Sequence, residues 1–250
     1  KRQIETFDMT LGVEEGENAK LALAEITNGL LKPLNKVGTR IIILDPREEV
    51  VEAIKNGNMQ NTISIDWHPV LSDSNAQKRI LGKINDDYIN IDINGHVTSV
   101  KPNEKLEAIT QEKDNEQEYW IRKNRTVNYK KKPYKVNLYA AAVPEDADNL
   151  DEQIKGIGIY RGGMRITSVS TRRIPAHIME RIYGYVTVGP YLEDELRNVE
   201  DPTHYTFADL DKGRGAAGKL KNWIDNELLL FARKKLGFDE EIIEEKNKKN

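Results

Sequence analysis

The stretch GIGIYRGGMRIT, residues 156–167, contains two strand-like runs on either side of a glycine pair. Two glycines between runs rich in β-branched and aromatic residues are typical of a β-hairpin. Similar strand patterns occur just before it, at 134–143, and after it, at 181–192. The sequence therefore predicts that the second half of the chain is built around a β-sheet.

A long amphipathic helix is predicted at 215–238. Six apolar residues recur at helical spacing, so one stripe of this helix faces a core. Basic residues near its C-terminal end suit the helix dipole, and Gly237 suits the C-terminal cap. Strands, hairpins and helices together predict an α+β (mixed α/β) fold, without the roughly eight strand–helix units of a TIM barrel. The six apolar residues are Leu220, Trp223, Ile224, Leu228, Phe231 and Leu236.

The first part of the chain contains shorter patterns. Runs of β-branched residues favour strands, an Asn-Gly pair between alternating runs favours a hairpin, and a glycine after an amphipathic run favours a helix end. The predicted elements are a strand at 38–46, a helix at 47–57 that ends at Gly57, a strand at 62–71 that ends at Pro69, a hairpin at 88–101, and an exposed polar segment at 101–118.

The amino-acid composition excludes several classes of protein. The 250 residues carry a net charge of -3, which excludes a wholly basic nucleic-acid binder. There is no cysteine, so disulfides and thiolate metal sites are excluded, and we expect a cytoplasmic protein. No run approaches the roughly 20 apolar residues of a membrane span, so no membrane partner is expected. Because the first residue is Lys, we expect a piece of something longer.

The glycine-rich stretch GRGAAGK, residues 213–219, matches the spacing G-x-G-x-x-G. A dinucleotide fingerprint should follow a buried strand, and the polar lead-in HYTFADLDK is not one. The Walker A pattern is also not met. The favoured interpretation is a glycine turn before the helix. Even so, a helix N-terminus close to Lys212, Arg214 and Lys219 suits a phosphate.

Local motifs for metal binding or hydrolysis are missing from the sequence. The four histidines do not occur at metal-ligand spacing, so no metal site is predicted. No G-x-S-x-G elbow is present, and no pair of carboxylates stands out for acid–base chemistry. The residues by themselves indicate a mixed α/β protein without a self-contained catalytic motif.

A basic, asparagine-rich stretch lies at 122–135. Lys130, Lys131 and Lys132 are candidate nucleic-acid contacts through phosphate groups, and Tyr129 and Tyr134 are candidates for base stacking. The other interpretation is a solvated connector at 122–132, since runs of charge are usually solvated. That interpretation gives a domain boundary near residue 132.

Several stretches resemble the GHKL ATPases, the family that includes the ATPase component of DNA gyrase, MutL, MORC proteins and large heat-shock chaperones. GTRIIILDP at 38–46 is similar to the strand that closes their nucleotide-binding domain. The hairpin GIGIYRGGMRI, the run YGYVTVGPYL and the stretch DPTHYTF with its following helix resemble parts of the transducer domain. The transducer has the fold of the second domain of ribosomal protein S5.

The resemblance implies three parts. Residues 1–60 are the end of a GHKL-type nucleotide-binding domain, 61–132 a connecting β-rich region with the basic linker, and 133–250 a transducer-like domain with the C-terminal helix. The family's E-x-x-x-N-x-x-D and D-x-G-x-G motifs, which bind magnesium and ATP and activate water, do not occur in this chain. ATP and magnesium are therefore expected only when a missing N-terminal ATPase segment is joined to it.

The resemblance also assigns roles. Gly38 and Thr39 would lie beside the adenine, and Lys212 or Lys219 would sense the nucleotide. Arg161 and Arg165 are expected to be surface or packing residues. Expected partners are the N-terminal ATPase segment, a second copy of the chain, and a nucleic acid or client protein.

The sequence is compatible with three functions. The first is the transducer portion of a GHKL-type ATPase, which couples ATP binding and hydrolysis to a conformational change. The second is a non-enzymatic module that binds nucleic acid or protein through 122–135. The third is a structural or assembly protein in which the short motifs are coincidental.

Overall fold

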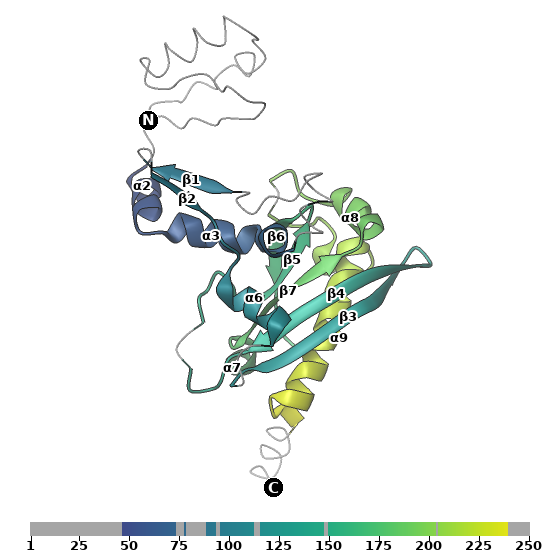
Figure 1. The fold of residues 1–250 in the computed structure, drawn as a ribbon. Helices are drawn as coiled ribbons and strands as arrows, with labels where there is room; N and C mark the ends of the chain where they lie inside the picture. The colour runs from purple at the N-terminus through teal and green to yellow at the C-terminus, as the bar shows by residue number, and fades with distance from the viewer. Residues whose placement is uncertain are drawn as a thin grey trace, which may run out of the picture. The chain divides into compact units, whose positions relative to one another are not determined.

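The computed structural model describes residues 47–73, 78, 89–93, 96–112, 116–147, 150–203 and 205–239. The chain divides into two compact units, 1–51 and 52–250, and all the described residues except 47–51 belong to the second. This unit is mixed α+β, as predicted, with a five-stranded sheet that has helices on both faces (Figure 1). The strand predicted at 38–46, with Gly38 and Thr39, lies outside the described residues.

The main sheet has the strand order β3-β4-β7-β5-β6. Neighbouring strands are antiparallel except β5 and β7, which are parallel. A separate antiparallel pair is formed by β1 and β2. The strands are β1 Asn90–Ile93, β2 His96–Ser99, β3 Glu118–Tyr129, β4 Lys132–Ala142, β5 Gly156–Arg161, β6 Met164–Val169 and β7 Ile182–Val188.

The helices are α2 Glu48–Lys55, α3 Asn58–Asp66, α4 His68–Ser72, α6 Glu104–Gln111, α7 Ala176–Met179, α8 Pro190–Arg197 and α9 Ala216–Lys235, with a 3-10 turn, η2, at Leu210–Lys212. Helices α2, α3 and α4 precede the first described strand, and the other helices lie between or after the strands.

The predicted hairpin at 156–167 is confirmed as β5 and β6. Gly162 and Gly163 form its turn with φ of 60° and 87°, values at which a side chain would be strained. Ile157 and Ile159 of β5 are fully buried. The stretch is therefore a core element of the sheet.

Each face of the sheet is covered by different helices. On one face, alternate residues of β4 such as Val136 and Leu138 pack with the apolar stripe of α9. On the other face, Tyr183 of β7 packs with residues of α3 and α6, including Ile65 and Leu106. Side chains alternate between the two faces along a strand, and both faces are covered, which explains why β5 and β7 are buried at nearly every position.

Several predicted elements are confirmed with small shifts. The helix predicted at 47–57 is α2, and Gly57 follows it with φ of 80°. The hairpin predicted at 88–101 is β1–β2, and the helix predicted at 215–238 is α9. The strand predicted at 181–192 ends at Val188, because Pro190 begins α8.

The strand predicted at 62–71 is wrong, because these residues lie in α3 and α4. The alternating pattern is too short to separate a strand from part of a buried helix. Pro69 lies in the first turn of α4, where the missing N–H is not needed for a helical hydrogen bond. Ile65 and Val70 are buried, so packing decides the helical form.

The segment 101–118 was predicted to be polar and exposed. This prediction is wrong for residues 104–111, which form α6 and bury two apolar side chains. The side chain of Asn103 accepts a hydrogen bond from the backbone N–H of Leu106 (3.1 Å), which caps the N-terminus of α6. Leu106 and Ile109, three residues apart, are buried against the sheet. Two apolar residues are enough to dock this short helix.

The connector predicted at 122–132 is also wrong. Residues up to Tyr129 belong to β3, which pairs with β4 from Glu118 opposite Ala142 to Tyr129 opposite Lys132. Residue 132, near which a boundary was predicted, therefore lies beside the turn of a hairpin. Arg122, Lys123 and Arg125 therefore lie on the edge strand β3, and Lys130 and Lys131 lie in the tight turn that follows it.

Candidate functional site

Both predicted lysines lie at the loop that begins α9. Lys212 ends η2, and Lys219 lies in the first turn of α9. Their side chains are exposed, as is that of Arg214, and none of the three makes an ion pair or side-chain hydrogen bond with a described residue. The loop therefore presents three unpaired cations to solvent.

A buried carboxylate lies against the start of α9. Asp209 is 7% exposed, and neither of its carboxylate oxygens has a hydrogen-bond partner among the described residues. Gly215, the N-cap residue of α9, has a φ of -80°, which suits any residue. A Cβ on Gly215, however, would lie 1.6 Å from Oδ2 of Asp209. Glycine is required here because the carboxylate occupies the space of a side chain.

The rest of the loop packs tightly on the first turn of α9. A Cβ on Gly218 would lie 2.7 Å from the backbone N of Gly213 and 2.8 Å from the backbone O of Asp209. The side chain of Asn222 donates a hydrogen bond to the backbone O of Gly213 (3.1 Å). The predicted glycine turn before the helix is thus confirmed, and its glycine spacing follows from the close approach of loop and helix.

The loop does not fit a phosphate at the helix end in this conformation. Helix N-termini attract anions, but a phosphate beside Gly215 would meet the like charge of Asp209. Lys212 and Lys219 remain exposed to a phosphate that approaches from outside the helix end. Within the described ranges, no group of three or more acidic or histidine side chains is placed to hold magnesium.

The same helix is attached to the edge strand β3. Oε2 of Glu227 on α9 accepts hydrogen bonds from Nε of Arg122 (2.8 Å) and Nε1 of Trp120 (3.0 Å). The ring of Trp120 stacks on Phe231 of α9, with centroids 5.9 Å apart. A displacement of α9 would therefore act directly on β3.

An ion pair connects the β5–β6 hairpin to the segment before the loop. Arg161 bonds both carboxylate oxygens of Glu200, and Glu200 forms a β-bridge with Phe207. Arg165 pairs with Asp66 of α3 (2.8 Å). Both arginines are largely buried and paired, so they hold elements together.

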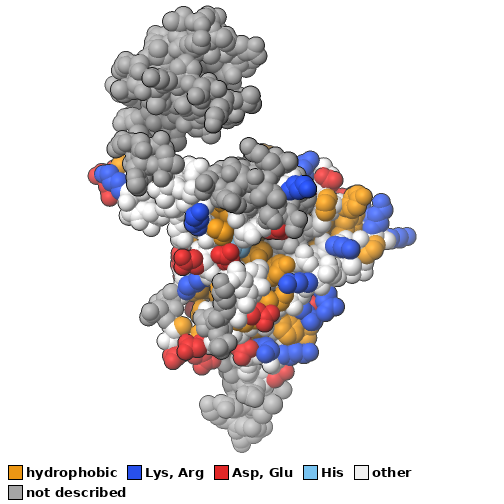
Figure 2. Space-filling model, in the orientation of Figure 1, with side chains coloured by type: hydrophobic (Ala, Val, Ile, Leu, Met, Phe, Trp, Pro, Cys, Tyr) orange, Lys and Arg blue, Asp and Glu red, His pale blue; other side chains and the backbone are white. Residues whose placement is uncertain are grey.

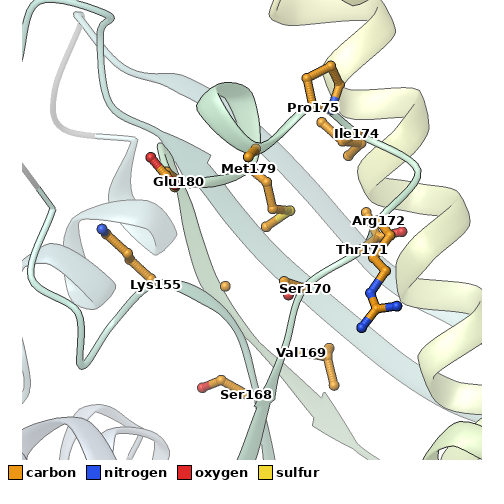
Figure 3. Close-up of a pocket in the computed structure, with 12 residues that line it drawn as sticks. Lys155, Ser168, Val169, Ser170, Thr171, Arg172, Ile174, Pro175, Met179 and Glu180 are labelled. Atoms are coloured by element: carbon orange, nitrogen blue, oxygen red, sulfur yellow. The ribbon is translucent and has the colours of Figure 1, made fainter.

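A hollow of about 590 Å³ lies between the end of β6 and α7, and Figure 3 shows the residues that line it. Met179 and Ile174 give it an apolar wall, and Lys155 and Glu180 lie on its other side. Lys155 is paired with Glu152. Arg172 is directed toward α9, away from Lys155. The hollow suits a small molecule with polar and apolar parts, but its charged groups do not converge on one point.

The predicted nucleic-acid contacts lie at the end of the β3–β4 hairpin. Lys130 and Lys131 form the turn, with φ of 49° and 62°, and Lys132 begins β4. Lys130 pairs with Glu195 of α8 (2.8 Å), and this hydrogen bond raises the pKa of Lys130. Lys131 and Lys132 are exposed and unpaired among the described residues. Figure 2 shows Lys and Arg side chains gathered there, with hydrophobic side chains between them.

Sequence reasoning missed three residues. Asp209 was read as part of a polar lead-in, although it lies shortly before the α9 N-terminus, where acidic residues are favoured. Tyr191, which is 81% exposed on α8, was placed in a strand. His68 is fully buried without a partner for either ring nitrogen among the described residues, and burial lowers its pKa to about 3. No pattern in the sequence marks that burial.

No family model, curated protein or solved structure matches this chain. No helix in the described part of the chain is both long enough and apolar enough to cross a membrane. The geometry of the chain itself must therefore support any proposal of function.

Proposed function

We propose that this chain is the transducer portion of a GHKL-type ATPase, which couples ATP binding and hydrolysis to a conformational change. The observation that carries the proposal is the direct junction between the cationic loop and α9. Lys212, Arg214 and Lys219 are free to contact phosphates, and the loop that bears them runs directly into the longest described helix.

The packing of α9 supports a role in transmitting movement. Leu220, Ile224, Leu228 and Phe231 are fully buried along one stripe, which ties the helix to the sheet. Because packed interiors deform little, a shift at the loop would move the helix and its contacts together. The bonds to Glu227 would carry that shift to β3.

ATP and magnesium would be bound largely by a segment joined to this chain. In this proposal Thr39 and Gly38 face the adenine, and Lys212 or Lys219 neutralises charge on the phosphates as water attacks. A second copy of the chain would pair with the first when nucleotide binds. The movement would act on a client protein or a nucleic acid.

The test is ATP hydrolysis by the complete protein encoded around this chain. We expect the in-frame sequence upstream of Lys1 to contain E-x-x-x-N-x-x-D and D-x-G-x-G. Lys212→Ala or Lys219→Ala should lower kcat by roughly tenfold or more. Lys105→Ala, which changes an exposed lysine of α6, is the matched control. The proposal fails if the motifs are missing upstream or if both variants keep the wild-type kcat.

A second candidate function is nucleic-acid binding at the β3–β4 turn. The observation that favours it is the aromatic surface beside the lysines. Tyr191, which is 81% exposed, lines a groove of about 790 Å³ together with Lys132 and Lys135. Tyr134 also borders this groove, but it is 7% exposed and packs in the core, so its ring is not open to the base stacking that was predicted for it. Lysines without an ion pair among the described residues, beside an exposed tyrosine, suit the phosphates and bases of a single strand.

Acidic residues on α8 limit this surface. Asp194 and Glu195 line the same groove, and Glu195 already holds Lys130. Binding to a labelled single-stranded oligonucleotide should therefore depend on Lys131 and Lys132. Changing both to Ala should weaken binding and reduce the slope of log affinity against log salt by roughly 1.5. Equal slopes for this variant and for Lys105→Ala would exclude the surface.

A further inference from the structure

We propose that the GRGAAGK loop is an anion-binding site whose resident anion in this conformation is the carboxylate of Asp209. The inference rests on the proposed function, because it concerns the same lysine loop. It goes beyond the proposed function because it identifies Asp209 as a competitor within the chain, and an incoming phosphate must displace its carboxylate.

The carboxylate of Asp209 lies in an unfavourable environment. Asp209 is buried, lies against the N-cap of α9, and lacks any hydrogen-bond donor among the described residues. A buried carboxylate without donors is unfavourable in a folded protein. The helix dipole is the compensating attraction, and it attracts an external anion as well as this one. The buried carboxylate of Asp209 is therefore stabilised by few interactions, and an external anion can displace it.

Three cations lie close to Asp209 in the sequence. Lys212, Arg214 and Lys219 belong to the loop and the first turn of α9 and are exposed, yet none pairs with Asp209. Each of these cations lies within four residues of Gly215 in the sequence, so a phosphate that entered there would be attracted by them as well as by the helix end. The loop thus offers an external anion more partners than it offers Asp209.

Glycine at position 215 leaves space beside its Cα for another group. The backbone conformation of Gly215 does not require glycine, so the lack of a side chain is explained by the group that lies beside its Cα. Oδ2 of Asp209 now occupies that space. When Asp209 withdraws, the same space is open to a phosphate oxygen.

The ligand is therefore a phosphate group, and Asp209 regulates its entry. Exchange of one anion for the other changes the contacts of η2 and of the first turn of α9. This makes Asp209 the residue that sets how tightly a phosphate must bind before the loop rearranges.

The experiment measures binding of inorganic phosphate to the full chain by calorimetry at constant ionic strength. Asp209→Asn should bind phosphate at least tenfold more tightly than the wild type. Asp211→Asn removes the same charge from an exposed neighbour in η2 and should change the affinity little. Adding Lys219→Ala to Asp209→Asn should abolish most of the gain.

The inference is overturned if Asp209→Asn binds phosphate no better than the wild type, or no better than Asp211→Asn. If the amide prevents folding, Asp209→Ala also removes the charge and gives the same readout. Because the test uses no nucleotide, a gain in phosphate affinity without ATP hydrolysis by the complete protein would leave this inference standing. The proposed function would then fail alone.

Discussion

Arg161 and Glu200 form an ion pair in which the guanidinium reaches both carboxylate oxygens, and the Glu200 side chain is 4% exposed. The pair joins the turn-side end of β5 to the segment that leads to Asp209. It is one of the contacts that hold the cationic loop in register with the sheet.

Breaking this pair should destabilise the fold. Glu200→Ala leaves the guanidinium of Arg161, which is 17% exposed, without its carboxylate. We expect the free energy of unfolding to fall by about 2–3 kcal/mol. Urea unfolding measures the change. Asp194→Ala, which removes one partner of the exposed pair with Arg197, should cost less than about 0.5 kcal/mol. Equal costs for the two variants would contradict the role of the Arg161–Glu200 pair.

His68 should make the protein sensitive to mild acid. Burial lowers the pKa of His68 to about 3, against 6.5 for an unperturbed histidine. The stability due to the neutral ring is fully present above pH 6.5 and is lost as the pH falls from 6.5 toward 3. Between about pH 7 and pH 5 the wild type should lose about 2 kcal/mol more than His68→Leu.

The measurement is urea unfolding of both proteins at the two pH values. His177→Gln, at an exposed histidine of α7, is the control and should follow the wild type. The ring of Tyr185 packs on the edge of His68 at 5.0 Å between centroids, so a leucine keeps an apolar neighbour there. If His68→Leu loses as much stability in acid as the wild type, the buried histidine is not the cause.

Gly215→Ala should be destabilising only while Asp209 is present. The added Cβ would lie 1.6 Å from Oδ2 of Asp209, so the substitution should cost about 3 kcal/mol in the wild type. In the Asp209→Gly background, the same change should cost less than about 1 kcal/mol. A double-mutant cycle from thermal or urea unfolding gives the coupling. Additive effects would show that the two residues do not compete for the same space.

Substitution of Phe231 should weaken the packing between α9 and β3. Phe231→Ala removes a fully buried ring and the surface on which Trp120 stacks. We expect a loss of about 3–5 kcal/mol of stability. Tryptophan fluorescence should also shift to longer wavelength as water reaches Trp120. Leu230→Ala, at a partly exposed position of the same helix, should change both readouts little.

Sequence patterns identified the elements whose periodicity was long or whose turn chemistry was distinctive. The Gly162–Gly163 hairpin and α9 were predicted because a glycine pair or several helical turns leave little ambiguity. The segment 62–71 was assigned to the wrong class because Ile65 and Val70 are buried in helices too short to show their period. Short elements are decided by tertiary packing, which a single sequence does not display.

Only the part of the candidate site that has a local sequence pattern was predicted. The spacing of the glycines pointed to the start of α9, and Lys212 and Lys219 were visible beside it. Asp209 was not predicted as a site residue. Its role depends on the loop folding back until the Asp209 carboxylate contacts Gly215, which the sequence does not display. Lys130 likewise was read as a free charge, while the structure pairs it with Glu195, a residue 65 positions away.

The position of β7 has a consequence for synthesis of the protein. The β3–β4 and β5–β6 hairpins pair residues close in sequence, whereas β7 lies between them and is the last strand made among those described. Hairpins form quickly from local contacts, but long-range pairing must wait for its partner. We therefore expect the two hairpins to form on the ribosome as separate pieces with open edges until β7 emerges. Chaperone protection is needed most in that interval, before one strand joins the two halves.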